Sequence, residues 1–280
     1  MRWQGERESE NVEDRRGSGG GLAIGGGLGG ILVLILALVF GADPRQLFEQ
    51  LPQANEGTQT SRPVNAEEEE LKKFVAVVLA QTEDAWGDIF RQRGKQYRKP
   101  TLVLFSDRVD SGCGLAAAAT GPFYCPEDEK LYIDLSFFRE LRTKYRAPGD
   151  FAIGYVVAHE VGHHVQKQLG IMNQVNAARR RGREEGANGA SVRLELQADF
   201  LAGVWAHYVQ DRGLVEVGDA EEALAAASAV GDDRLQRQAQ GYAVPDSFTH
   251  GTSAQRARWF RKGMETGDLR QGDTFSAAEL

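Results

Sequence analysis

An uncharged stretch near the start of the chain limits what this sequence can fold into. No residue from Gly17 to Ala42 carries a charge, and every residue from Leu22 to Phe40 is apolar or glycine. A run of this length matches the hydrocarbon core of a bilayer. We therefore expect one transmembrane helix over residues 21–42.

Two other interpretations of this stretch stay open. A cleaved signal peptide would have a shorter charged leader and a small-residue cleavage site, and no Ala-x-Ala follows Phe40. A buried helix of a soluble domain is disfavoured by the glycines between Gly20 and Gly30, because glycine weakens a helix that packing does not hold. An uncleaved anchor agrees best with the length and the flanks.

The charges beside the stretch predict its orientation. Arg2, Arg7, Arg15 and Arg16 precede it, and only Arg45 follows closely. Basic residues stay preferentially in the cytoplasm. We expect a single-pass protein of the cell membrane with a cytoplasmic N-terminus and its domain on the extracytoplasmic side.

The rest of the chain divides by composition. A charged leader covers residues 1–20, a proline-containing linker covers 43–64, the main domain covers 65–267 and a flexible tail covers 268–280. The net charge of −7 is spread along the chain, without the basic stripe that follows a nucleic-acid backbone. We expect no nucleic-acid partner.

The two cysteines, Cys113 and Cys125, lie in a loop with glycine and proline within the exterior part. A disulfide bond would agree with an oxidising compartment, and two free thiols are the alternative.

Hydrophobic periodicity predicts a mostly helical α+β domain with a small sheet. The helix at 150–170 is apolar nearly all round, so we expect it to be buried. Strands are expected at 101–105 and 131–135, and the other helices at 65–94, 191–210, 220–240 and 253–262.

The buried helix carries the segment His159-Glu160-Val161-Gly162-His163. Residues four apart on a helix share a face, so the two imidazoles can bind one ion, for which Zn²⁺ is the expected metal. Glu160 lies at the neighbouring angle, where a carboxylate can act as general base toward water on the metal. Two histidines satisfied inside a packed helix are the alternative interpretation.

A catalytic zinc needs a third protein ligand. The metzincin extension is excluded because Gln166 and Leu169 stand where it requires glycine and histidine, and the second Glu-x-x-His of a di-iron bundle does not occur. Glu195 and Asp199 share a face of the helix at 191–210. We expect Glu195 to bind the metal and Asp199 to accept a hydrogen bond from His159, unless the pair is a solvated helix face.

At these residues the chain resembles the bacterial neutral zinc metallopeptidase family, many members of which are membrane-anchored. The resemblance implies a zincin-like domain in which His159, His163 and Glu195 bind zinc and Glu160 is catalytic. The segments that carry it are Thr82–Trp86, Pro100–Phe105, Gly121–Pro126, Tyr132–Phe138, His159–Gln166, Glu195–Asp199 and His250–Arg256.

The expected activity is hydrolysis of peptide bonds in peptides or proteins by metal-activated water. His250 and Arg256 are candidates for stabilising the oxyanion, with helix capping or surface pairing as the alternative. The strand Leu131 to Leu135 is expected to be a short edge strand, which could pair with extended substrate. The alternative function is a zinc-holding binding or chaperone-like module on the membrane with little proteolysis.

Overall fold

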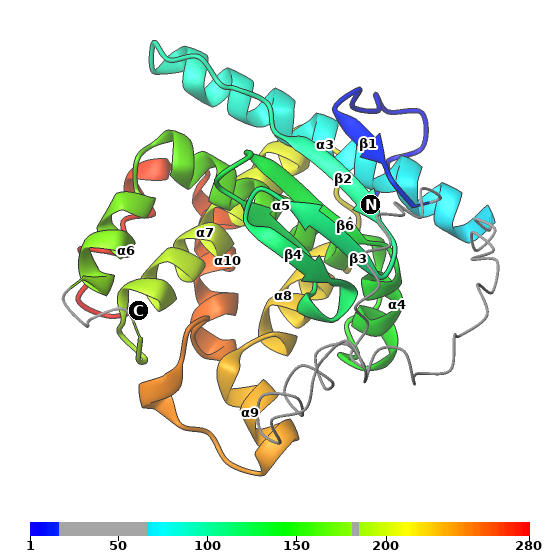
Figure 1. Ribbon diagram of the computed structural model, residues 1–280. Coiled ribbons are helices and arrows are strands. Elements are labelled where there is room, and N and C mark those ends of the chain that lie inside the picture. The colour runs from blue at the N-terminus through cyan, green and yellow to red at the C-terminus, as the bar shows by residue number, and fades with distance from the viewer. Residues whose placement is uncertain (17–65, 181–184) are drawn as a thin grey trace, which may run out of the picture. The chain divides into compact units, whose positions relative to one another are not determined.

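The computed structural model describes residues 1–16, 66–180 and 185–280, whose arrangement is shown in Figure 1. The span and linker predicted at 21–42 and 43–64 lie outside the described residues. None of the described helices combines the length and the hydropathy that a membrane crossing needs.

The described parts form a mostly helical α+β fold, as predicted. Its helices are α3 (Ala66–Gln92), α4 (Ser136–Thr143), α5 (Asp150–Gln168), α6 (Met172–Arg179), α7 (Ala190–Asp211), α8 (Asp219–Ala229), α9 (Asp232–Gln240) and α10 (Ser253–Thr266), with short 3-10 turns η1 (Ala118–Thr120), η2 (Pro245–Ser247) and η3 (Leu269–Gln271).

A four-stranded sheet in the order β1-β2-β6-β5 lies beside α5, as Figure 1 shows. Its strands are β1 (Val12–Asp14), β2 (Thr101–Phe105), β5 (Phe123–Cys125) and β6 (Lys130–Asp134). β1, β2 and β6 run parallel, and β5 is antiparallel to β6. A separate hairpin pairs β3 (Arg108–Ser111) with β4 (Gly114–Ala117).

The prediction that the strand at 131–135 is an edge strand was wrong. It forms β6, which is hydrogen-bonded on both sides, to β2 and to β5. Among the described strands the edges of this sheet are β1 and β5. Each is only three residues long, too short to give a periodic pattern in the sequence.

Residues 1–15, expected as a separate leader, belong to the same compact unit as residues 65–280. β1 adds in parallel to β2, and the Trp3 ring meets the Phe74 ring edge to face at 5.3 Å. The polar groups of this segment find partners on the domain, since Arg7, Ser9 and Asn11 all bond to Glu83.

Helix α5 is buried because α7 and α8 pack against it and the sheet lies beside it. α7 in turn packs closely on α10. A Cβ added to Gly203 of α7 would lie 2.1 Å from the Phe260 carbonyl oxygen, and one added to Gly263 of α10 would lie 2.1 Å from the Phe200 carbonyl oxygen. The two backbones therefore touch, and this contact holds α10 beside the centre of the domain.

Two further expectations differ from the structure. The helix expected at 220–240 is broken into α8 and α9 at Gly231, where a Cβ would lie 2.3 Å from the Ser253 backbone nitrogen. The tail at 268–280 packs on the domain, since Arg193 donates to the backbone carbonyls of Thr274, Phe275 and Ala277 and Leu280 is buried.

Candidate metal centre

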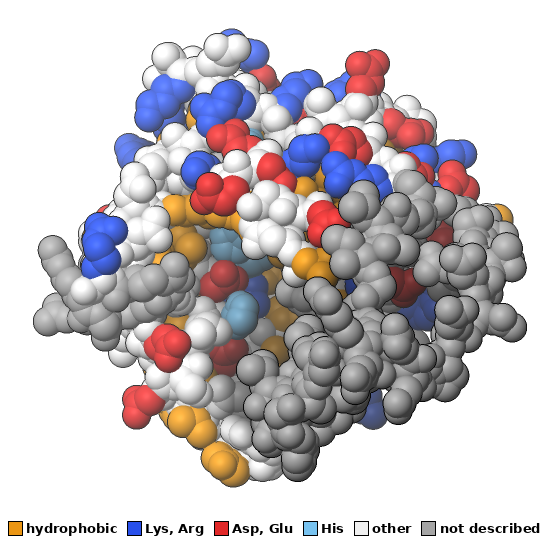
Figure 2. Space-filling view, viewed as in Figure 1, with side chains coloured by type: hydrophobic (Ala, Val, Ile, Leu, Met, Phe, Trp, Pro, Cys, Tyr) orange, Lys and Arg blue, Asp and Glu red, His pale blue; other side chains and the backbone are white. Residues whose placement is uncertain are grey.

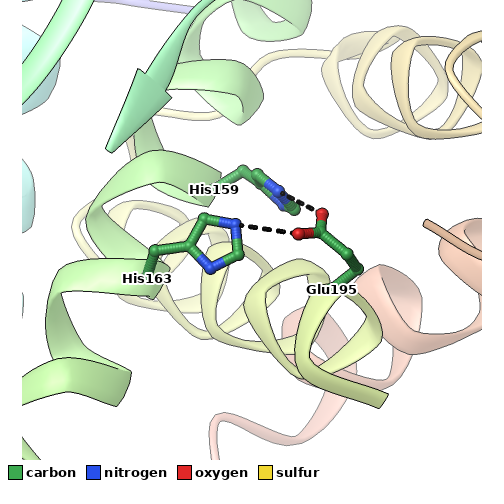
Figure 3. A group of neighbouring side chains, drawn as sticks. All are labelled: His159, His163 and Glu195. Atoms are coloured by element: carbon green, nitrogen blue, oxygen red, sulfur yellow. Dashed lines mark hydrogen bonds and ion pairs between the residues drawn. The ribbon is translucent and has the colours of Figure 1, made fainter. Parts of the chain in front are cut away.

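Three side chains from α5 and α7 converge on one point (Figure 3). His159 and His163 project side by side from α5 and face Glu195 on α7. The Nε2 atom of His159 lies 3.2 Å from Glu195 Oε2, and the Nε2 atom of His163 lies 3.3 Å from Glu195 Oε1. One donor atom from each residue lies within 4.8 Å of the others. The structure thus brings together the three residues that the sequence predicted as ligands.

The other ring nitrogen of each histidine is held by an acceptor. His159 Nδ1 lies 2.9 Å from Asp199 Oδ1, as predicted for that carboxylate. His163 Nδ1 donates to Gln166 Oε1 at 2.9 Å. A proton held on Nδ1 leaves Nε2 free as the coordinating atom, so both rings present Nε2 to the same point.

Asp199 is the centre of a buried network behind His159. Its side chain is 0% exposed. Arg256 donates Nε to Oδ2 at 2.8 Å and Nη2 to Oδ1 at 2.9 Å, and the Tyr155 hydroxyl donates to Oδ1 at 2.6 Å. A carboxylate with this many donors keeps a fixed orientation, and it fixes the His159 ring in turn.

The carboxylates of this cluster favour a positive charge between them. Burial opposes protonation of His159, but the Asp199 and Glu195 carboxylates outweigh it and raise its pKa to about 10. Burial likewise opposes protonation of His163, and Glu195 raises the pKa of that ring. The pKa of Glu195 is held well below its ordinary value, because the two imidazoles overcome the effect of burial.

Glu160 is buried beside the two histidines on α5. Burial raises the pKa of its carboxyl, and the positive charge of His159 and His163 opposes that rise. A carboxylate whose pKa is raised by an apolar environment is a better proton acceptor than one in water.

The centre opens to the surface on one side. Figure 2 shows His and Asp/Glu side chains at the bottom of a hollow on this face. The side chains of His163 and Glu195 are 12% and 17% exposed, so small molecules can reach them. A third histidine, His164, turns away, with Nδ1 3.1 Å from the Tyr124 hydroxyl of β5.

The two candidates for oxyanion stabilisation have different positions. Arg256 is 4% exposed and bound to Asp199, and its Nη2 atom lies 4.0 Å from Glu195 Oε2. His250 is 50% exposed, and its Nδ1 atom lies 3.1 Å from Asp232 Oδ1. Glu195 is close enough to raise the pKa of His250, although the hydrogen bond to Asp232 is the larger cause.

Sequence reasoning missed three residues of this region. Gln166 was noted only for excluding a metzincin, although its position one helical turn after His163 could have suggested a contact. Tyr155 lies four residues before His159, and this helical spacing likewise could have suggested a contact. Asp232 looked like an ordinary acidic residue inside the helix expected at 220–240.

The donor set fits a zinc ion. Two imidazole Nε2 atoms and one carboxylate match the His₂Glu ligands of catalytic zinc sites, and both histidines have the second hydrogen bond that such ligands need. Cys113 and Cys125 play no part, because they form the expected disulfide bond, with an S–S distance of 2.05 Å.

Comparisons with known proteins agree with this geometry. The family profile described as "Putative neutral zinc metallopeptidase" matches residues 1–275. "Uncharacterized protein YpfJ" of Escherichia coli K12 is 51% identical over 98% of this chain and 99% of its own length. "Uncharacterized protein Rv2575" of Mycobacterium tuberculosis is 43% identical over 74% of this chain and 73% of its own length. No solved structure matches the chain.

Proposed function

Since the chain belongs to the neutral zinc metallopeptidase family, we propose that it is a zinc-dependent peptidase that hydrolyses peptide bonds of peptides or proteins. The observation that carries the proposal is the convergence of His159, His163 and Glu195 next to the buried carboxyl of Glu160. The same donor set supports Zn²⁺ as the cofactor and a zincin-like domain as the setting.

A bound zinc would supply Lewis acidity, which polarises a carbonyl group and makes water more acidic. The protein's own residues perform the proton transfers. Glu160 accepts the proton of the attacking water at its carboxylate and returns it to the amine that leaves. Its raised pKa brings it nearer to the pH at which such a base works best.

His250 is the candidate for stabilising the developing oxyanion. It is exposed enough to touch substrate, and Asp232 raises its pKa, which favours a ring that can donate from Nε2. Arg256 supports the site differently, through its two hydrogen bonds to Asp199.

Association of residues 21–42 with the cell membrane stays a prediction. Its basis is the uncharged run in the sequence, which lies outside the described residues.

The test combines zinc content with cleavage. Zinc bound to the purified protein is measured by mass spectrometry, and a peptide library is incubated with wild type and with Glu160→Gln. We expect about one zinc per chain in both, and cleavage by wild type only. Glu221→Gln, an exposed glutamate on α8, is the matched control and should cleave like wild type.

Two results would contradict the proposal. Near-zero zinc in freshly purified protein would exclude the metal site. Zinc binding with no cleavage that depends on Glu160 would favour a zinc-holding binding or chaperone-like module.

A further inference from the structure

One buried carboxylate organises the loop that carries His250. Asp232, at the start of α9, has a side chain that is 10% exposed. Its Oδ2 atom accepts the backbone N–H groups of Thr249, His250 and Gly251 at 2.7, 2.6 and 3.1 Å. Its Oδ1 atom lies 3.1 Å from His250 Nδ1. Backbone and side chain of His250 are thus held by the same group.

This loop lies against the helix turn that carries Glu195. A Cβ built on Gly251 would lie 3.2 Å from Val192 Cγ1 and 3.3 Å from Leu196 Cδ2, so the loop backbone touches α7 on both sides of Glu195 in sequence. Gly251 has a φ of +90°, a conformation that favours glycine. The loop therefore packs on the same turn of α7 that carries Glu195.

His250 Nδ1 lies 3.1 Å from Asp232 Oδ1 and 2.9 Å from the Thr249 hydroxyl, and the Asp232 carboxylate can accept a hydrogen bond only from a protonated Nδ1. A proton on Nδ1 points to Asp232, so Nε2 is the atom left for a substrate. The charged groups near His250 are Asp232 on α9, Glu195 on α7 and Arg256 on α10. The two carboxylates favour the protonated ring, and Arg256 opposes it.

We propose that Asp232 is a positioning residue, which holds the 249–251 loop on α7 and directs Nε2 of His250 toward the carbonyl oxygen of the substrate. The proposal deepens the proposed peptidase function and rests on it. Nε2–H donates a hydrogen bond to that oxygen as negative charge develops on it. Asp232 itself does not touch the substrate.

Two variants and a control test the proposal. Asp232→Asn keeps the size of the side chain, His250→Ala removes a half-exposed ring, and Asp246→Asn changes an exposed aspartate of η2 nearby. We expect kcat to fall about 100-fold in His250→Ala and about 10-fold in Asp232→Asn, with KM and zinc content near wild type, since one oxyanion donor contributes about that much. The double variant should be no slower than His250→Ala, and Asp246→Asn should match wild type.

The pKa of His250, measured by NMR of the ring nitrogens in the zinc-free protein, gives a readout that does not need activity. We expect this pKa to fall in Asp232→Asn. In the pH profile of kcat, activity carried by protonated His250 is lost as pH rises through that pKa, so the alkaline limb should move to lower pH in the variant.

The outcomes separate the two proposals. An unchanged His250 pKa in a folded Asp232→Asn protein, or wild-type kcat in His250→Ala, would overturn the role of Asp232. A wild-type enzyme that binds zinc and cleaves nothing would overturn the peptidase function, whereas the NMR titration would still decide whether Asp232 holds the ring.

A second inference comes from the other end of the chain. Glu83 of α3 has a side chain that is 1% exposed. Its Oε1 atom accepts the Ser9 hydroxyl at 2.5 Å and the Asn11 amide at 2.7 Å, and its Oε2 atom pairs with Arg7 at 3.2 Å and with Lys99 at 3.1 Å. Three of these four partners come from residues 1–15. A buried carboxylate depends on such partners, so this segment is part of the folded domain.

The pairing of β1 with β2 adds a constraint on the backbone. Val12, Glu13 and Asp14 are in register with Leu102, Val103 and Leu104. Glu13 also forms an ion pair with Lys130 of β6 at 2.7 Å. Hydrogen-bonded strands of one sheet cannot lie on opposite sides of a bilayer.

We infer that residues 1–15 and residues 66–280 lie in the same compartment. This differs from the predicted arrangement, in which a single crossing separates a cytoplasmic leader from an extracytoplasmic domain. The inference concerns only the two described parts and holds for either compartment.

Cysteine labelling of the full chain tests it. Glu10→Cys and Arg91→Cys, both at exposed positions, are made separately and treated with a membrane-impermeant maleimide in bacteria whose outer membrane has been permeabilised. The unaltered chain, whose two cysteines are bridged, is the control. We expect both variants to be labelled before lysis, or both to be protected until lysis. Labelling of one with protection of the other would overturn the inference.

Discussion

Replacing Asp199 with asparagine removes one charge from the network behind His159 and changes the size of the side chain very little. Asp199 accepts hydrogen bonds from Tyr155, His159 and Arg256, and it is fully buried. An amide has one oxygen where the carboxylate has two. Its NH₂ group must therefore face a donor. In one orientation this donor is Arg256 Nε, and in the other the NH₂ group faces the Tyr155 hydroxyl, His159 Nδ1 and Arg256 Nη2.

Two magnitudes follow from this geometry. Arg256 is 4% exposed, so the variant leaves a buried guanidinium without its nearest counter-charge, with only Glu195 at 4.0 Å, which costs about 3 kcal/mol of unfolding free energy. The His159 ring loses the acceptor that orients it, which should weaken zinc binding about 10- to 100-fold.

Urea unfolding with a chelator present measures the loss of unfolding free energy without the contribution of bound metal. Competition with a chromogenic chelator measures the zinc affinity. Asp211→Asn, an exposed aspartate on the same helix, is the matched control and should change neither quantity. A loss below about 1 kcal/mol together with unchanged zinc affinity would refute the role assigned to Asp199.

Three further predictions concern the framework around the centre. Gly203→Ala should destabilise the protein by about 3 kcal/mol in urea unfolding, because its Cβ would lie 2.1 Å from a carbonyl oxygen of α10, whereas Gly87→Ala, with open space around it, should not destabilise it. Glu83→Gln should cost stability at pH 7. Burial opposes ionisation of Glu83, but its hydrogen bonds lower its pKa below 4.5. The loss of unfolding free energy relative to wild type should therefore shrink as pH falls below about 4.5. A loss that does not depend on pH would contradict this. Reducing the Cys113–Cys125 disulfide should lower the unfolding free energy by about 3 kcal/mol, and equal urea midpoints with and without reductant would count against it.

The convergence of His159, His163 and Glu195 was partly predictable, because helical spacing determines much of its geometry. His159 and His163 four residues apart must share a face, and Glu195 with Asp199 repeats the same spacing on a second helix. That the two faces meet could not follow from spacing. It depends on glycines such as Gly162, where a Cβ would lie 3.0 Å from the Ala198 carbonyl oxygen of α7.

The parts that the sequence did not predict depend on contacts between distant residues. β1 and β5 are three residues long and have no pattern of their own, so only their partners in the sheet define them. Glu83 and Asp232 look like solvated acidic residues, and their burial becomes intelligible only with the segments that supply their hydrogen bonds. Residues 1–15 were misplaced for the same reason, because charge patterning does not show which charges find partners.

X-ray absorption at the zinc K-edge tests the central claim most directly. For the purified wild-type protein we expect about one zinc per chain, with two imidazole nitrogens and a carboxylate oxygen at about 2.0–2.2 Å. In Glu195→Ala the affinity should fall and the carboxylate contribution should disappear, while both imidazoles remain. A first shell without two imidazoles, or a Glu195→Ala spectrum identical to that of wild type, would contradict the assignment of His159, His163 and Glu195 as the zinc ligands.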